Sequence, residues 1–304
     1  MGRGSYTAAD WTRLRSSRNL HQQQPVEYIF SRRQADSAYH SKGILFRTSR
    51  DPEPDTKATP VIIGFDVTAS MGYLASELAT NSLHKVMTGL LSNPNITGPQ
   101  LLCAAIGDCK SDRSPLQVTQ FEADIRVIQQ LLELHLEGGG GGNYGESYNL
   151  LWHFAANHTR HDHYDKRGKK GYLFTIGDDR CHEGLLSTEI SACFPTPGTY
   201  PVANQALIAK AREKYHIFHI HIDKGNPADD GIFQQWQSLL PGCCTRIDKK
   251  DVSCLAELIT TLISVMEGET PNQAMKSLDQ QAAERIARSV AFIQPPKNTN
   301  VISF

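Results

Sequence analysis

The sequence predicts an α/β protein with a doubly wound, mostly parallel sheet of six strands and helices on both faces. Three observations predict this fold class. Short apolar runs alternate with segments of helical periodicity over residues 59–267. The intervening helical segments are long enough to connect parallel strands across the faces of a sheet. The chain has 304 residues, 39% of them hydrophobic and 21% charged, which suits a domain of about 200 residues with flanks.

Six apolar runs are predicted as strands. The first of them ends in an acid, and the third is short enough to be an edge strand. The predicted strands are Val61–Asp66, Gln100–Gly107, Thr119–Phe121, Tyr172–Ile176, His216–Ile222 and Cys244–Ile247.

The segments between these strands carry apolar residues at helical spacing. The predicted helices are Leu74–Leu91, Ile125–Leu136, Glu146–Ala156, Asn204–Lys214, Ile232–Leu240 and Val252–Met266. The segment Asn157–Gly171 is rich in charge and contains His158, His161 and His163. We expect a solvated loop there, with a transition-metal site as the alternative.

The two ends of the chain differ from the middle. Residues 1–50 hold nine Lys or Arg and three Asp or Glu, a balance of +6. We expect residues 1–58 to be a basic extension that packs loosely on the main domain, or a docking arm for an acidic partner. A regular alternation of basic and aromatic residues is missing, which argues against nucleic acid as a partner.

The last segment, residues 268–304, is predicted to be an amphipathic helix and a tail. Thr270 and Pro271 suit the cap and the first position of a helix. The helix is expected to stop before Pro295. Its apolar stripe consists of Met275, Leu278, Ala282, Ile286 and Val290.

Charge and cysteine content indicate the compartment. The net charge is −1, and the seven cysteines include no C-x-x-C pair, which favours a reducing environment over a disulfide framework. No leader peptide and no apolar run of about 18 residues is visible. We therefore expect a cytoplasmic protein without a membrane partner.

The most informative stretch is the end of the first strand, Asp66-Val67-Thr68-Ala69-Ser70. A carboxylate and two hydroxyls follow one another on a tight turn between a strand and a helix. Open α/β sheets bind ligands at this edge. Three oxygen groups without Cys or His suit a hard cation such as Mg²⁺.

Two later stretches are expected to reach the same edge of the sheet. The glycine run Gly138–Gly142 lets the backbone approach a ligand closely and is followed by Asn143 and Glu146. It lacks the Gly-Lys-Ser/Thr ending of a phosphate-binding loop. The second stretch ends the strand Tyr172–Ile176 with Gly177 and Asp178, so Asp178 lies beside Asp66 if the two strands are neighbours.

These motifs resemble those of von Willebrand factor A (vWA) domains, which are doubly wound, Rossmann-like folds. Asp66 to Ser70 is similar to the Asp-x-Ser/Thr-x-Ser signature of the metal-ion-dependent adhesion site (MIDAS) of that family. The order of predicted elements agrees over residues 59–267. The loop around Asn143, which lacks the family's Thr, resembles the Gly-Gly-Asp-x-Pro-Glu loop of the alpha-kinase-associated branch. The stretch from Asp178 to Gly184 resembles that branch's Asp-Ala-Pro-x-His-Gly segment.

The resemblance implies a metal site and a function. By the family pattern, the hydroxyls of Thr68 and Ser70 bind Mg²⁺ directly, with Mn²⁺ or Ca²⁺ as alternatives. Asp66, Asp178 and Asn143 bind it directly or through water. The remaining coordination position accepts a carboxylate from a partner protein, for which an ATPase or an assembly component is the expectation. The implied function is a non-enzymatic protein-interaction module.

Two other functions fit parts of the sequence. A phosphohydrolase of the haloacid-dehalogenase type also places an acid at a strand end, and Asp66 would be its nucleophile. Thr68 occupies the position of that family's acid/base Asp, which counts against it. The other alternative is a vWA scaffold that binds partners without metal, in which Thr68 and Ser70 cap the following helix.

Overall fold

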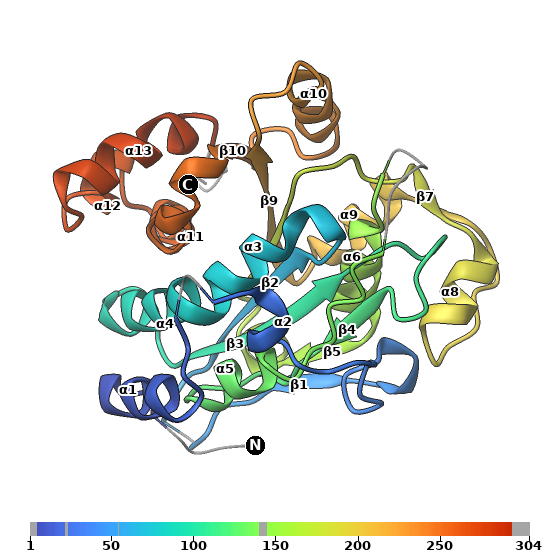
Figure 1. The fold of residues 1–304 in the computed structure, drawn as a ribbon, viewed down its shortest axis with the longest axis horizontal. Coiled ribbons are helices and arrows are strands. Elements are labelled where there is room, and N and C mark those ends of the chain that lie inside the picture. The colour runs from blue at the N-terminus through green and yellow to red at the C-terminus, as the bar shows by residue number, and fades with distance from the viewer. Residues whose placement is uncertain (1–4, 22–23, 54, 140–144, 294–304) are drawn as a thin grey trace, which may run out of the picture.

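The computed structural model describes residues 5–293 except 22–23, 54 and 140–144. Its centre is a six-stranded sheet in the order β10-β9-β6-β2-β3-β4, parallel except for β4, which confirms the predicted fold class (Figure 1). The strands are β2 (Thr59–Asp66), β3 (Pro99–Ile106), β4 (Leu116–Val118), β6 (Gly171–Gly177), β9 (Tyr215–Asp223) and β10 (Cys244–Asp248).

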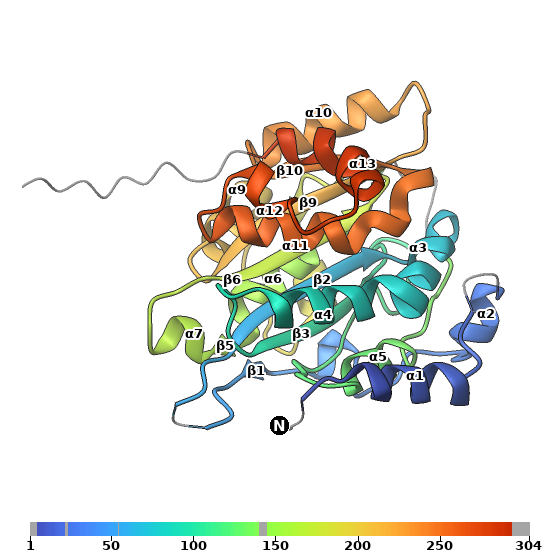
Figure 2. The same ribbon diagram turned by 90° about the vertical axis from the view of Figure 1, so that its left-hand side faces the viewer.

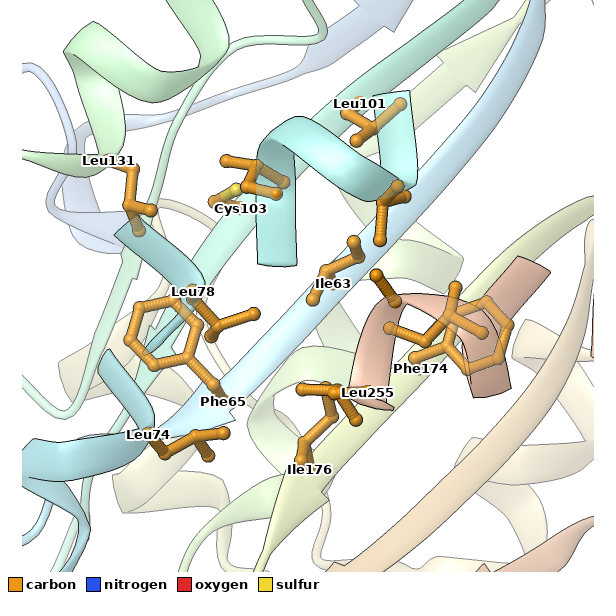
Figure 3. Close-up of a cluster of buried hydrophobic side chains, with 14 of the residues drawn as sticks. Ile63, Phe65, Leu74, Leu78, Leu101, Cys103, Leu131, Phe174, Ile176 and Leu255 are labelled. Carbon is orange, nitrogen blue, oxygen red and sulfur yellow. The ribbon is translucent and has the colours of Figure 1, made fainter. Parts of the chain in front are cut away.

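Strand β2 lies inside the sheet between β6 and β3, and both of its faces are buried. Ile63 and Phe65 point into one apolar cluster and Ile62 into the other. Figure 3 shows Ile63 and Phe65 among side chains of the neighbouring strands and of the helices above them. Each fully buried side chain of this size stabilises the fold by about 2 kcal/mol. Position 64 has room only for glycine, because Leu151 fills the space that a Cβ would need.

Helices cover both faces of the sheet. The face of Ile63 is covered by the continuous helical segment from α3 through a π-helical turn to α4, and by α11, which packs beside α4 (Figure 2). The face of Ile62 is covered by α6, α9 and α10. The helices are α3 (Gly72–Glu77), α4 (Leu83–Ser92), α5 (Arg126–Leu131), α6 (Tyr148–Asn157), α9 (Asn204–Ala211), α10 (Asp229–Leu239) and α11 (Leu255–Met266).

The N-terminal segment is packed more closely than expected. Helix α1 (Ala8–Ser17) buries Trp11 and Leu14 in the apolar cluster below α4, followed by the short helix α2 (Val26–Ile29). Strand β1 (Arg47–Ser49) pairs with β5 (Thr159–His161) in a separate two-stranded sheet. The expectation of a loosely packed arm is therefore corrected for the described part of residues 1–58. The boundary at residue 59 stays a prediction.

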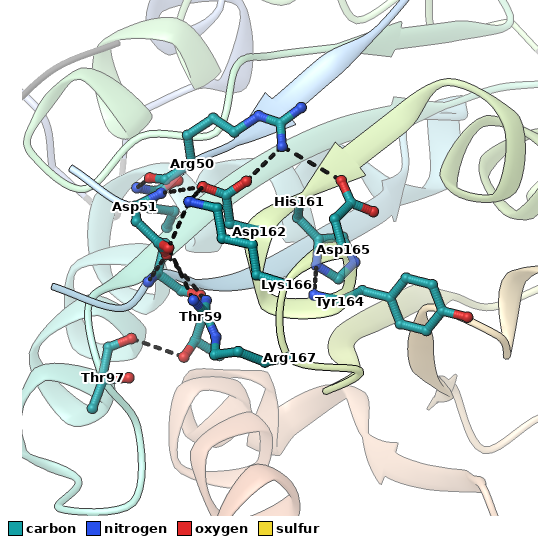
Figure 4. Close-up of polar contacts among 12 residues, drawn as sticks. Arg50, Asp51, Thr59, Thr97, His161, Asp162, Tyr164, Asp165, Lys166 and Arg167 are labelled. Atoms are coloured by element: carbon teal, nitrogen blue, oxygen red, sulfur yellow. Dashed lines mark hydrogen bonds and ion pairs between the residues drawn. The ribbon is translucent and has the colours of Figure 1, made fainter. Parts of the chain in front are cut away.

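The histidine-containing segment after α6 is not a solvated loop. It forms β5 and the short helix α7 (Asp162–Asp165), and His161, Asp162 and His163 are all buried. Figure 4 shows the polar contacts that hold it: Arg50 Nη1 lies 2.5 Å from Asp162 Oδ1, and the guanidinium of Arg167 bonds both carboxylate oxygens of Asp51. Charges in this segment therefore fasten the N-terminal extension to the main domain.

The remaining elements lie at the periphery. The predicted C-terminal helix is two helices, α12 (Pro271–Ala274), capped by Thr270, and α13 (Gln280–Ala291), capped by Asp279. Its apolar stripe packs against the cluster that contains α11. Helix α8 (Ser187–Cys193) and the antiparallel pair of short strands on either side of it, β7 (Gly184–Leu185) and β8 (Val202–Ala203), were not predicted. No helix in the described portions of the chain has both the length and the apolarity to cross a bilayer.

Candidate metal centre

The predicted acids meet at the carboxyl edge of the sheet. Strands β2 and β6 are parallel neighbours, with Phe65 opposite Ile176, so the residues after both strand ends share one edge. A cavity of about 360 Å³ opens there. Its lining includes Thr68, Ser70, Glu146, Asp178, Lys224 and Asp229. The structure thus brings the two predicted hydroxyls and Asp178 together at one cavity.

Asp66 lies behind this cavity, fully buried. Its Oδ1 accepts hydrogen bonds from the backbone N–H and the hydroxyl of Thr68, at 2.8 and 2.7 Å, and its Oδ2 accepts one from the Tyr148 hydroxyl at 2.9 Å. Burial raises the pKa of Asp66 to about 7, against the lowering effect of the Thr68 bonds. The Thr68 hydroxyl proton points at Asp66, so its oxygen lone pairs are left for a ligand in the cavity.

The hydroxyl of Thr68 does not cap the following helix. Its hydrogen bond goes to Asp66, and within the described residues its side chain accepts no capping N–H from the 3₁₀ turn Ala69–Met71 that follows. Ser70 is also paired with an acid, since its Oγ donates to Asp178 Oδ2 at 3.2 Å. Because the hydroxyls of Thr68 and Ser70 donate their protons to Asp66 and Asp178, their oxygen lone pairs remain available at the cavity.

Lys224 is a cation at this site that the sequence analysis did not identify. Its Nζ lies 2.7 Å from Asp178 Oδ2, the same oxygen that accepts from Ser70. Burial lowers the pKa of Lys224, but the hydrogen bond to Asp178 and the charges of Asp178, Asp229 and Asp179 together outweigh that effect, and the net shift is upward. The sequence could have indicated Lys224, because it follows the end of the predicted strand His216–Ile222 and so lies at the same edge of the sheet as Asp178.

Glu146 is an acid that the prediction mentioned but did not count among the ligands. It lines the cavity, is only 3% exposed, and its Oε2 has no hydrogen-bond partner among the residues that the structure describes. Burial, together with the charges of Asp66 and Asp108, raises the pKa of Glu146 to about 9. A buried carboxyl oxygen without a partner is costly, which makes this side chain a candidate ligand for a cation.

A hydrogen-bonded network fixes the backbone that carries Glu146 and Tyr148. Oδ1 of the buried Asp108 accepts from the Ser147 hydroxyl at 3.0 Å and lies 2.9 Å from Nε2 of His182. The backbone of Glu146 bonds Arg180 and His182 on the opposite strand-like segment. Asp108 therefore supports the site from behind.

Gly177 is needed for the contact between Tyr148 and Asp66. A Cβ at position 177 would overlap the Tyr148 hydroxyl, so a side chain there would displace the phenol. The glycine at the end of β6 thus allows α6 to place its first residue against the end of β2.

The residues at the cavity fit a hard divalent cation. Besides burial, the charge of Asp178 raises the pKa of Asp66 and the charge of Asp66 raises that of Glu146, so these carboxyl groups lie near one another. Thr68 and Ser70 add neutral oxygens at the cavity. The candidate ligands therefore include both acids and hydroxyls. Within the described part of the chain, no group of three or more His, Cys, Asp or Glu side chains is placed to hold a metal ion. The predicted ligand Asn143 lies outside the described residues.

No family model and no curated protein matches the chain. Among solved structures, it is similar to proximal thread matrix protein 1 from the mussel byssus with a zinc-occupied MIDAS motif, at 13% identity and a TM-score of 0.45, over 69% of this chain and 49% of that one. It thus spans about half the length of the mussel protein.

Two bacterial structures are similar at the same level. One is the pilus adhesin SpaC from Lactobacillus rhamnosus GG, at 13% identity and a TM-score of 0.42, over 67% of this chain and 30% of that one. The other is the vWF domain of the type V pili tip protein Mfa5 from Porphyromonas gingivalis, at 11% identity and a TM-score of 0.44, over 71% of this chain and 98% of that domain.

Proposed function

We propose that this chain is a non-enzymatic protein-interaction module that docks a carboxylate of a partner protein on a metal ion at the cavity between β2 and β6. The ion is Mg²⁺ under cellular conditions, with Mn²⁺ or Ca²⁺ as substitutes. An ATPase or another assembly component is the expected partner, and no activity of the chain's own is required.

One observation carries this proposal: the Ser70 hydroxyl donates to Asp178, 108 residues away in the chain. This bond joins the turn after β2 to the end of β6, which are two of the three segments of the predicted site. Glu146, from the start of α6, lines the same cavity and supports the proposal with an oxygen that lacks a partner among described residues.

Each group has a role in this account. Thr68 and Ser70 present neutral oxygens to the ion, while Asp66 and Asp178 accept the protons of those hydroxyls and provide negative charge. Glu146 adds a third acid, and Asn143 is the proposed further ligand from the glycine-rich loop. A bound Mg²⁺ supplies an exchangeable coordination position for a partner's carboxylate oxygen.

One observation favours the alternative function of a phosphohydrolase, and another argues against it. Lys224 provides a cation at the cavity that such an enzyme would use to hold phosphate. However, Asp66 is fully buried and both of its carboxylate oxygens are hydrogen-bonded, so neither is free to attack a substrate. Magnesium-dependent hydrolysis of an aryl phosphate that is lost in Asp66→Asn would favour the enzyme.

The test of the docking function is a pull-down with the immobilised full chain, with Mg²⁺ or with EDTA. Ser70→Ala removes an exposed hydroxyl at the cavity, and Ser92→Ala removes one from the exposed end of α4 as the matched control. We expect a partner that is retained by wild type and Ser92→Ala in Mg²⁺ and lost with EDTA or Ser70→Ala. Identical partners under all conditions would favour the metal-independent scaffold.

We infer a reducing, cytoplasmic setting for this interaction. All seven cysteines are free thiols in the structure. Burial raises the pKa of Cys103 and Cys181 to about 12, so both are inert packing residues. Fractionation of the native protein, with thiol labelling of the intact cells, tests this inference.

A further inference from the structure

The contact between Lys224 and Asp178 places an ammonium group where the proposed function needs a metal ion. Nζ of Lys224 lies 2.7 Å from Asp178 Oδ2, and the Ser70 hydroxyl lies 3.2 Å from the same oxygen. The Asp178 side chain is 4% exposed and that of Lys224 is 29% exposed. An internal cation therefore reaches in from the rim and neutralises a buried acid.

The backbone of Lys224 is fixed, while its side chain can move. The N–H groups of Lys224 and Asn226 donate to Oδ2 of the buried Asp229, at 2.9 and 2.8 Å. Asp229 begins α10 and so anchors the segment after β9. The four-carbon stem of a lysine is flexible, so the ammonium can leave Asp178 without any change in this backbone.

An ammonium and a divalent cation cannot both contact Asp178 without cost. Like charges about 4 Å apart repel each other strongly near a protein surface. We propose that Lys224 is a built-in counterion, which neutralises Asp178 in the metal-free protein and is displaced from it when a divalent cation binds. This inference rests on the proposed metal-dependent docking, and it adds a competitor that sets the metal affinity of the site.

The displaced ammonium has other partners in the same cavity. Asp179 and Asp229 also line it, and both attract Lys224. If the Lys224 ammonium is held beside Asp179 and Asp229, the carboxylate of an incoming partner protein would meet two positive charges, the ammonium and the bound ion. Metal loading would then move the Lys224 ammonium from Asp178 to the rim of the cavity, and partner docking would depend on that exchange.

The first test is calorimetric titration of Mn²⁺ into the metal-free full chain. Lys224→Met removes the competitor, and Lys85→Met is the matched control, because Lys85 forms a 3.0 Å ion pair with Glu257 away from the cavity. We expect Lys224→Met to bind Mn²⁺ about five- to tenfold more tightly than wild type. Lys85→Met should stay within about twofold of wild type.

A second test uses wild-type protein and does not depend on the folding of a variant. Lysine acylation followed by peptide mass spectrometry measures how accessible each ammonium is. We expect Mg²⁺ to increase the labelling of Lys224 severalfold and to leave that of Lys85 unchanged.

The outcomes separate the two proposals. Equal or weaker Mn²⁺ binding by Lys224→Met, or unchanged Lys224 labelling, would overturn the exchange and leave the metal site standing if wild type binds. Failure of wild type and of both variants to bind any Mn²⁺ would overturn the metal site and the exchange with it.

Discussion

The Tyr148 hydroxyl donates a 2.9 Å hydrogen bond to Oδ2 of Asp66, a residue 82 positions earlier in the chain. Both side chains are fully buried. The bond ties the first turn of α6 to the end of β2 and, with the two bonds from Thr68, holds the carboxylate in one orientation. The orientation of Asp66 is thus set by α6 as well as by its own strand.

Removal of this phenol should affect both stability and metal binding. Tyr148→Phe leaves Asp66 Oδ2 without that donor, which should lower the free energy of unfolding by about 1–2 kcal/mol. It should also weaken Mn²⁺ binding about tenfold, because Asp66 loses its fixed orientation. Urea unfolding and calorimetry measure the two effects.

The control for this experiment is Tyr215→Phe. Tyr215 is equally buried, and its hydroxyl is hydrogen-bonded to Thr159 at 2.8 Å, away from the cavity. This variant should lose comparable stability and keep wild-type Mn²⁺ affinity. Equal Mn²⁺ affinity of Tyr148→Phe and wild type would show that Asp66 does not need the phenol.

The metal-free protein should lose stability as the pH rises. Burial raises the pKa of Asp66 to about 7 and that of Glu146 to about 9, both above the ordinary range of carboxyl groups. A raised pKa means that the folded state holds these protons more tightly than the unfolded chain. The resulting stability is fully present below the unfolded pKa and is lost as the pH passes through the folded value.

The measurement is urea unfolding in EDTA at pH 6 and pH 9. Wild type should be less stable at pH 9 by at least about 1 kcal/mol, and Glu146→Gln should show a smaller difference because its side chain does not ionise. The same pH dependence in Glu146→Gln and wild type would contradict a buried, proton-binding Glu146.

The ion pair between Asp51 and Arg167 should hold the N-terminal extension to the domain. Its two hydrogen bonds, at 2.9 and 3.0 Å, and the bond from the Ala58 N–H hold the pKa of Asp51 well below its usual range (Figure 4). Its stabilisation is present above the unfolded pKa and is lost as the pH falls. Asp51→Ala should cost about 2 kcal/mol at pH 7.

Acid unfolding checks this prediction. The stability difference between Asp51→Ala and wild type, measured in urea, should shrink between pH 5 and pH 2, because the Asp51 carboxyl takes up a proton in the unfolded chain while it stays ionised in the folded protein. Proteolysis should also cleave the variant first within residues 1–58. A difference that does not depend on pH would mean that packing, rather than charge, fastens this segment.

The sequence predicted the parts of the fold that depend on local periodicity. Strand β2 and the turn from Asp66 to Ser70 are contiguous, so their oxygens could be identified without a structure. Asp178 was placed beside Asp66 on the condition that β2 and β6 are neighbours, and the two strands are paired in the structure. The edge strand was placed three residues too late, because its position is set by antiparallel pairing with β3 and not by its own apolar pattern.

The missed residues depend on contacts between distant segments. The sequence pattern around Tyr148 indicates only a buried residue of a helix. Its hydroxyl reaches Asp66 because α6 crosses the end of β2 in the folded protein. Glu146 becomes a buried acid because the segment before α6 bonds to Arg180 and His182. The histidine-containing segment reads as polar, but pairing of β5 with β1 buries it. Such pairings leave no periodic signal in the sequence.

The most direct test of this account is the titration of Mn²⁺ into the metal-free full chain at pH 8. We compare wild type with Asp178→Asn, which removes the acid opposite Ser70, and with Asp165→Asn, which removes an exposed acid on α7. We predict one ion bound per chain, affinity lower by about tenfold or more in Asp178→Asn, and wild-type affinity in Asp165→Asn. Equal affinity in all three proteins, or no binding by wild type, would contradict it.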